Sequence, residues 1–308
     1  MSRPLVGCIL NRLGDADAAQ WRQTIELAET AGLDHLAVGD HVAFHTGAGS
    51  DGMLAASTVL SVSDRLSTNT AVYLLPLRHP LLVARQLADI SVRAPGRFTF
   101  GVGIGGEDRH EVEACGVDPT TRGRRMDECI QAVRQLLTGE PVDFEGEFVN
   151  LTQAQITPPV ASTIPIVVGG RSDAAISRAG KHGDGWFGIW VSADRYERVI
   201  TQMKEAGHNA SRSEIKWTNA LNIWCGVAKS SDAARPHVAS AMEAFYGMPY
   251  ERFEKWSPAG PASELADFLI PYIAAGCSMF NLIINGSSAE AEIEAAAEIR
   301  QRLLNASS

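Results

Sequence analysis

Short β-type runs alternate with helical segments along this 308-residue chain, and this alternation constrains the fold more than any other feature. Eight such runs are rich in Val, Ile and aromatic residues and are bounded by Gly, Pro or polar residues. They are expected at Val6–Leu10, His35–Val38, Thr70–Leu75, Arg97–Gly103, Ile164–Val168, Trp186–Trp190, Thr218–Val227 and Ser278–Ile284. Strands separated by helices form parallel sheets, and eight strands close a barrel. The pattern therefore predicts an α/β fold, a (β/α)8 TIM barrel formed by residues 1–308 as a single domain.

Helices are expected between these runs, at about 16–31, 53–63, 80–93, 119–138, 172–180, 193–207, 231–245, 261–275 and 288–304. Pro80 and Pro119 are typical of a helix's first turn. Gly32, Gly180 and Gly276 each follow an Ala and precede an apolar run, which predicts three similar helix-to-strand turns. The strand-to-helix segments are longer, so we expect loop insertions at the C-terminal face of the strands, where sites of this fold lie.

The charge and the cysteines restrict the class of partner. A formal charge of −9 disfavours nucleic acid and anionic membranes, and a small-molecule substrate is expected instead. The five cysteines are scattered without a C-x-x-C pair, which indicates reduced core residues. No apolar stretch suggests a signal peptide or a membrane span, so a cytoplasmic protein is expected.

A glycine turn stands out in the segment IPIVVGGRSDAAISRAG, from Ile164 to Gly180. Gly169 and Gly170 lie between a strand and a helix, where the chain can bend sharply and direct free N–H groups at an anion. Gly169, Gly170, Arg171 and Ser172 are therefore interpreted as a phosphate cradle for a cofactor. The less specific interpretation is a tight turn whose glycines only allow the helix to pack.

Five ordered segments carry a family resemblance: VGDHVAFH at 38–45, TAVYLLPLRHP at 70–80, GRFTFGVGIGGE at 96–107, RGRRMDE at 122–128, and IPIVVGGRSDAA followed by GDGW. Together they resemble the bacterial-luciferase-like flavin monooxygenase superfamily, particularly its deazaflavin (coenzyme F420)-dependent branch. The resemblance implies a barrel, usually dimeric, that holds a flavin or deazaflavin at the C-terminal ends of its strands. The alternative within that superfamily is an enzyme that uses FMN and molecular oxygen.

The resemblance also implies roles for individual residues. His41 would do acid/base work beside the reactive ring carbon, and Asp40 would contact the cofactor. The bond between Ala71 and Val72 would be a cis peptide that supports the ring. Taken alone, the Asp-His pair is more typical of a strand-end cap with a solvated histidine, but within the ordered motifs it indicates a site.

The loop after the fourth strand supplies further candidates. Gly103, Gly105 and Gly106 would allow the backbone to approach a bulky ligand, and no helix is expected directly after them, unlike in a dinucleotide-binding turn. The resemblance places a glutamate here near the substrate, either Glu107 or, as a competing match, Glu111.

The remaining candidates are pocket residues and cofactor-tail contacts. Phe44, His45 and Trp190 are expected to line the substrate pocket, whereas Arg78 and His79 could equally be surface residues or contacts to the tail. The resemblance also implies that the glycine turn, residues 169–172, contacts the tail of the cofactor.

The sequence thus predicts an oxidoreductase that transfers hydride between F420 and a small organic substrate, as a homodimer. FMN-dependent oxygenation and non-catalytic deazaflavin binding stay open as alternatives. A metal site is not expected, because the first strand has no histidine pair.

Overall fold

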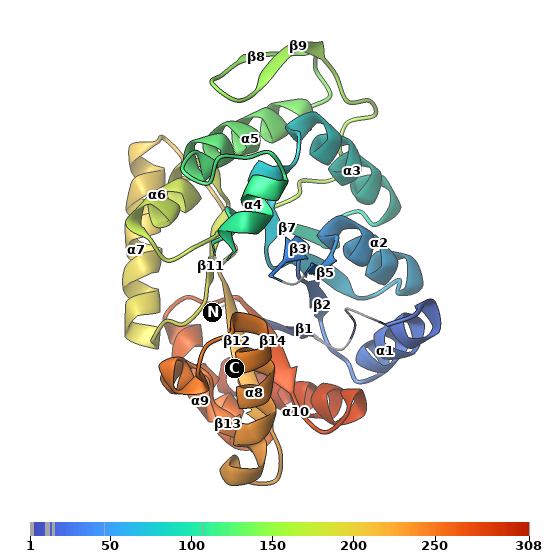
Figure 1. Ribbon diagram of the computed structural model, residues 1–308, viewed down its shortest axis with the longest axis vertical. Coiled ribbons are helices and arrows are strands. Elements are labelled where there is room, and N and C mark those ends of the chain that lie inside the picture. Colours follow the sequence, from blue (N-terminus) through green and yellow to red (C-terminus); the bar gives the residue numbers. More distant parts are fainter. Residues whose placement is uncertain (1–2, 10–12, 14–15, 46, 107, 308) are drawn as a thin grey trace.

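The computed structural model describes residues 3–9, 13, 16–45, 47–106 and 108–307, and in these residues eight parallel strands close into a barrel (Figure 1). The strands are paired in the order β10, β11, β12, β14, β1, β2, β5, β7, and pairing of β7 with β10 closes the ring. Their bounds are β1 (Leu5–Ile9), β2 (His35–Val38), β5 (Ser67–Thr70), β7 (Phe98–Gly103), β10 (Ile166–Gly169), β11 (Gly185–Gly188), β12 (Ala220–Val227) and β14 (Met279–Asn285). The predicted (β/α)8 TIM barrel is confirmed.

Helices surround the barrel (Figure 1). They are α1 (Ala18–Thr30), α2 (Gly52–Val62), α3 (Pro80–Arg93), α5 (Arg122–Leu136), α6 (Asp173–His182), α7 (Ala193–Asn209), α8 (Ser231–Tyr246), α9 (Ala262–Ala274) and α10 (Ala289–Ser307). Polar caps explain several of their starts. Asp17 forms a capping box with Gln20 at α1, and the Asp51 carboxylate accepts the amides of Met53 and Leu54 at α2. Pro80 occupies the first turn of α3, as predicted.

A polar layer crosses the inside of the barrel. Asn281 on β14 donates through Nδ2 to Asn69 Oδ1 at 3.0 Å and to Asn222 Oδ1 at 2.8 Å, while its Oδ1 lies 2.7 Å from His35 Nε2. The four side chains belong to four strands and are all buried. Burial lowers the pKa of His35 to about 4, because the charged imidazolium would lose its hydration there. Buried amides that satisfy one another tie the strands together without exposing a polar group.

Insertions build up the upper face of the barrel. After β2 the chain forms an antiparallel hairpin of β3 (His41–Phe44) and β4 (Ala48–Ser50), and after β7 it forms the short helix α4 (Arg109–Ala114). Helix α8 packs against β12 and β14 and lies in front of them in Figure 1. The predicted insertions at the strands' C-terminal face are therefore present.

Smaller elements complete the chain. A second hairpin, β8 (Val142–Glu145) with β9 (Asn150–Ala154), lies outside the barrel beyond α5 and was not predicted (Figure 1). The other short elements are β6 (Tyr73–Leu74), η2 (Leu75–Leu77), η3 (Tyr250–Arg252), η4 (Glu254–Trp256) and β13 (Ala259–Gly260).

Two predicted boundaries in the first half of the chain were wrong. The third strand begins at Ser67 rather than Thr70, and it breaks at Ala71 and Val72 before β6 resumes the pairing with β7. The helix expected from about 119 begins at Arg122, because the Asp118 side chain and backbone hold the preceding residues in a turn.

Two expectations about glycines were also wrong. Gly180 does not end α6; it lies inside the helix, where a Cβ would be 2.2 Å from Met203 O, so its lack of a side chain lets α6 pack on α7. Gly32 and Gly276 do have positive φ, as the predicted turns require. The second wrong expectation was that no helix directly follows the glycines of the loop after β7. The helix α4 begins there, and Asp108 caps it by accepting the amide of His110.

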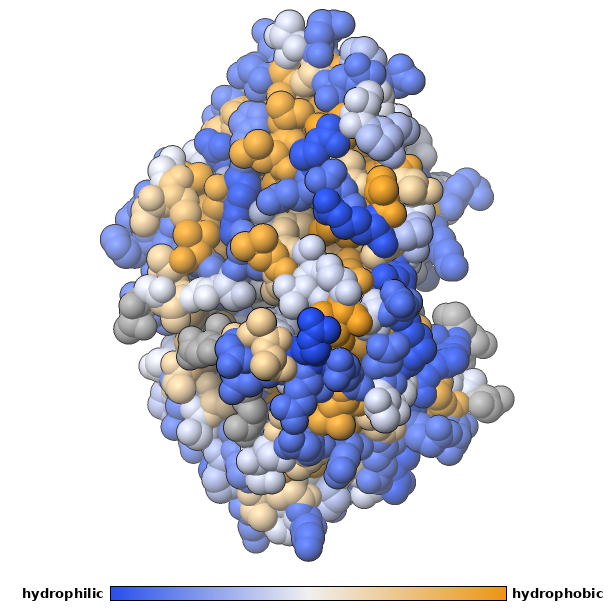
Figure 2. Space-filling view, turned by 90° about the vertical axis from the view of Figure 1, so that its right-hand side faces the viewer, coloured by the Kyte–Doolittle hydropathy of each residue, from blue (hydrophilic) through white to orange (hydrophobic). Residues whose placement is uncertain are grey.

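The face formed by α1, α2 and α3 carries apolar residues among hydrophilic ones (Figure 2). Leu54 on α2 and Leu82 on α3 are 70% and 66% exposed. Within the described residues, no helix combines the length and the apolar character that a membrane crossing requires.

Candidate active site

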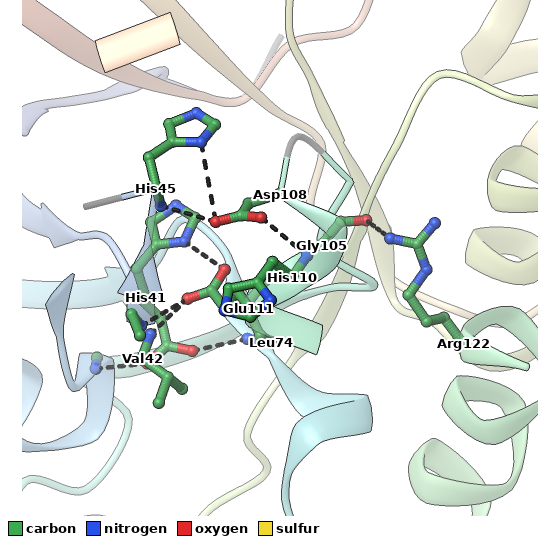
Figure 3. Close-up of polar contacts among 12 residues, drawn as sticks. His41, Val42, His45, Leu74, Gly105, Asp108, His110, Glu111 and Arg122 are labelled. Carbon is green, nitrogen blue, oxygen red and sulfur yellow. Dashed lines mark hydrogen bonds and ion pairs between the residues drawn. The ribbon is translucent and has the colours of Figure 1, made fainter. Parts of the chain in front are cut away.

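His41 lies at the mouth of the barrel, on the first residue of β3, and Glu111 reaches it from α4 (Figure 3). The Glu111 Oε2 atom is 3.0 Å from His41 Nδ1, and its Oε1 accepts the amides of Val42 at 2.6 Å and Ala43 at 3.1 Å. Glu111 is only 2% exposed, whereas the His41 side chain is 22% exposed. One buried carboxylate thus holds both the imidazole and the strand that carries it.

This contact determines what the imidazole can do. A carboxylate only accepts hydrogen bonds, so Nδ1 carries the hydrogen and Nε2 of the neutral ring keeps a free lone pair. In the part of the chain that the structure describes, Nε2 makes no hydrogen bond to protein. His41 can therefore take a proton from a ligand at Nε2, and the adjacent carboxylate would stabilise the imidazolium that forms.

The Asp40 carboxylate is enclosed by protein donors. Arg78 donates to both oxygens, at 2.7 and 2.8 Å, and the amides of Gly52 and Leu74 donate at 2.9 and 2.8 Å. Burial raises the pKa of Asp40, and the Arg78 guanidinium counteracts part of that rise. Asp40 thereby joins the end of β2 to the start of α2 and to β6. Four protein donors already occupy this carboxylate. Its direct contact with a cofactor stays a prediction.

A bulge follows β5. The peptide bond between Ala71 and Val72 is cis, as the resemblance implied. The Val72 side chain then occupies space that two glycines leave open, since a Cβ on Gly103 would lie 2.4 Å from Val72 Cγ2 and one on Gly169 would lie 3.0 Å from Val72 Cγ1. These two glycines are therefore needed for packing at the mouth, whatever ligand they face.

The glycine turn lies at the end of β10. Gly170 has φ +126°, a conformation that favours glycine, and Ser172 caps α6 by accepting the amide of Ala175. The amides of Ser172, Asp173 and Ala174 take no protein acceptor in the described residues, so they can bind an anion at the N-terminus of this ten-residue helix. Arg171 is exposed and lies over the Trp190 ring, 4.9 Å from its centroid. This arrangement fits a phosphate-bearing cofactor.

A cavity of about 550 Å³ opens beside His41. Asp40, His41, Phe44 and His45 line it, together with residues from α1, α2, β4 and α8. The Phe245 ring of α8 stacks on Phe44 with centroids 4.9 Å apart and lies 5.9 Å from the His41 ring. The predicted pocket residues Phe44 and His45 thus share a cavity with His41.

Trp190 and the loop glycines lie elsewhere. Trp190 is absent from the described lining of this cavity and packs against Tyr246 and Phe253, with centroids 5.0 and 4.7 Å away. Gly105 and Gly106 have room for a Cβ, with contacts of 3.6 Å or more at Gly105 and none within 4 Å at Gly106. Glu107 lies outside the described residues.

Several site residues were missed or left undecided by sequence reasoning. Glu111 was only a competing match, and its selection rests on the short helix α4, which Asp108 caps while also accepting the His45 amide at 2.7 Å. Arg78, left undecided, proves to be the partner of Asp40. Phe245 gave no local signal, because it lies about 200 residues from His41 in the sequence.

Sequence comparison relates the chain to proteins of known and unknown function. It is 37% identical to an uncharacterized protein of Mycobacterium tuberculosis, over 50% of this chain and 52% of that protein. It is 32% identical to an F420-dependent glucose-6-phosphate dehydrogenase of Kineococcus radiotolerans (64% and 60%), and 30% identical to 4-hydroxyprotoasukamycin monooxygenase of Streptomyces nodosus subsp. asukaensis (70% and 62%). The chain spans about half to three fifths of the length of these relatives.

Solved structures share the fold at low sequence identity. An F420-dependent secondary alcohol dehydrogenase in complex with an F420-acetone adduct matches with a TM-score of 0.83 at 20% identity, over 98% of this chain and 99% of that one. The oxygenating constituent of 3,6-diketocamphane monooxygenase from Pseudomonas putida, in complex with FMN, matches with a TM-score of 0.78 at 15% identity, over 98% of both chains. The family model for luciferase-like monooxygenases matches residues 7–269, and this chain belongs to that family.

Proposed function

We propose that this protein is an oxidoreductase that transfers hydride between coenzyme F420 and a small organic substrate. The observation that carries the proposal is His41 at the mouth of the barrel, whose Nδ1 is held by buried Glu111 while its Nε2 has no protein partner among the described residues. Hydride transfer to or from a carbon bearing oxygen requires a proton to move as well, and an imidazole in this tautomer can accept it. Relatives and structural neighbours whose names include F420 support the choice of cofactor.

The residues present can hold such a cofactor. The free amides at the start of α6 would bind its phosphate, and Arg171 stands beside them. The bulge at Val72 would support the ring. When bound, the deazaflavin supplies or receives the hydride, and the protein contributes position and proton transfer. Asp40, paired with Arg78, would act on the site by holding the residue before His41 to the amides of Gly52 and Leu74.

The test begins with cofactor binding. Purified protein is titrated with F420 and, separately, with FMN, and binding is followed by fluorescence. We expect selective binding of F420. Selective binding of FMN, with a micromolar dissociation constant, would overturn the cofactor assignment and favour the oxygen-using alternative. A relative and a structural neighbour named as monooxygenases support that alternative.

The role of His41 is tested by His41→Ala. We expect F420 affinity to stay within several-fold while turnover falls by about 100-fold or more, the upper part of the range for loss of an acid/base group. His110→Ala is the matched control, because His110 is exposed on α4 near the same loop. Unchanged turnover in His41→Ala would remove this residue from the mechanism. F420 binding without turnover of any alcohol or carbonyl compound would favour a non-catalytic binding protein.

A further inference from the structure

We infer that the substrate is a neutral, largely apolar alcohol or carbonyl compound, and not a sugar phosphate or another anion. The inference deepens the proposed function and rests on it for the hydride chemistry. It is carried by the cavity beside His41, whose volume of about 550 Å³ lies within the range of small-molecule sites.

The described lining of this cavity is mainly apolar. Of its eighteen residues, twelve have apolar side chains, two are glycines and four are polar. Leu13 and Trp21 contribute from the side of α1, Phe44 from the hairpin, and Ala241 and Phe245 from α8. Side chains from segments distant in sequence thus converge on one apolar space, which favours a ligand that gains by leaving water.

The polar lining residues do not supply a site for an anion. Asp40 is already paired with Arg78, and no Lys or Arg is among the described lining residues. His45 Nδ1 faces the Asp108 carboxylate at 3.8 Å. Among the described lining residues, a phosphate or carboxylate would find no fixed positive charge to offset the hydration it loses, and such burial is costly. A neutral substrate avoids this cost.

The cavity and the glycine turn lie on opposite sides of the barrel. The cavity is lined by residues at β1 and β2, whereas the turn follows β10, and β1 is four strands from β10 in either direction around the ring. A cofactor phosphate held at the turn would therefore lie away from this cavity, which would be open to the substrate. His41 belongs to the cavity wall, with Glu111 on its Nδ1.

In the oxidation of an alcohol, the carbinol C–H bond would break, with bound oxidised deazaflavin supplying the hydride acceptor. The O–H proton would pass to His41 Nε2, and the C=O bond would form. The alcohol is oxidised by two electrons and the deazaflavin is reduced by two. For a carbonyl substrate every movement is reversed. A single hydroxyl or carbonyl group near His41 is therefore sufficient, and the rest of the substrate occupies apolar surroundings.

The experiment uses a series of unbranched 2-alkanols with three to nine carbons, and glucose 6-phosphate, with F420 as hydride acceptor. Because burying one methylene contributes about 0.8 kcal/mol, kcat/KM should rise roughly fourfold per added carbon until the cavity is full. Glucose 6-phosphate should be turned over at least about 100-fold less efficiently than the best alkanol, as expected when a charge is buried unpaired. A series without dependence on chain length, or preferred turnover of the phosphate, would overturn the inference.

A substitution in the cavity wall tests whether the dependence of kcat/KM on chain length arises in this cavity. Ala241→Leu adds volume to the cavity wall on α8, so the longest alkanols should lose about tenfold or more in kcat/KM while propan-2-ol stays within about twofold. Ser240→Leu, on the exposed side of the same helix, is the control and should change neither. Equal effects of the two variants would refute the placement of the substrate in this cavity.

Binding measured without cofactor separates the two proposals. Calorimetry of the cofactor-free protein should rank the alkanols in the same order as turnover does. Alkanol binding in a protein that fails to bind F420 would refute the hydride chemistry and leave the class of cavity ligand supported. F420-dependent turnover with no chain-length dependence would refute the substrate class alone.

Discussion

Glu111→Gln tests the arrangement at the mouth of the barrel most directly. The change keeps the length of the side chain but removes the negative charge that lies 3.0 Å from His41 Nδ1. A hydrogen bond to a charged group contributes about 1.5–3 kcal/mol, which corresponds to a loss of roughly 10- to 150-fold in kcat/KM. The glutamine amide can also donate to Nδ1 and thereby favour the tautomer whose Nε2 carries a hydrogen. That tautomer cannot accept the substrate proton.

The assay is steady-state turnover of an alkanol with F420, together with F420 affinity. The affinity should change little, because Glu111 lies on α4 and the glycine turn precedes α6. A glutamine oxygen can still accept the amides of Val42 and Ala43, so urea unfolding should show whether the hairpin is retained. Glu113→Gln, on the exposed side of α4, is the matched control. A Glu111→Gln protein that folds normally and keeps kcat/KM within threefold of the parent would refute the reasoning.

Three further predictions concern stability and are measured by urea unfolding. Burial lowers the pKa of His35 to about 4, so between that pH and about 6.5 the unfolded chain binds more protons than the folded protein. The free energy of unfolding should therefore fall by about 3 kcal/mol as the pH is lowered through this range. His35→Gln should flatten this part of the pH profile, and an unchanged slope would contradict the assignment. Gly103→Ala should cost about 1–3 kcal/mol through overlap with the Val72 side chain, and adding Val72→Ala should recover part of that cost, whereas additive losses would argue against the contact. Asp40→Asn should cost about 3 kcal/mol, because the mostly buried Arg78 loses its 2.7 Å charged partner and keeps only the Asp51 carboxylate at 3.8 Å, and a neutral effect would show that the pair is not needed for folding.

The barrel could be predicted because its signal is local and repeated. Each run of β-branched and aromatic residues lies between helical segments, and all eight runs became strands of one closed sheet. Boundaries were less predictable where tertiary contacts decide them. Gly180 has the sequence context of a helix end, yet α6 continues to His182, and the residue is small because Met203 of α7 packs against it.

The site was predictable only in part, for a related reason. The glycine turn and the Asp-His pair lie next to strand ends, so their sequence context shows where they must fall. The partner of His41 could not be chosen between two neighbouring glutamates, because the choice depends on α4, a single short helix held by the Asp108 cap. The contribution of Phe245 depends on how α8 folds over β12 and β14, which no local pattern encodes.

The same long-range contacts explain how one histidine can combine exposure with a defined orientation. A residue at the start of a surface hairpin would ordinarily sample several rotamers, because loops are more mobile than the barrel beneath them. Here Glu111 holds both the ring and the two following amides, while the preceding Asp40 is bound by Arg78 and by the amide of Leu74 beyond the cis bond. Asp40 and Glu111 are both buried, whereas the His41 ring that they hold is partly exposed and lines the cavity. Orientation by buried neighbours thus leaves Nε2 free to react, which is the arrangement that proton transfer requires.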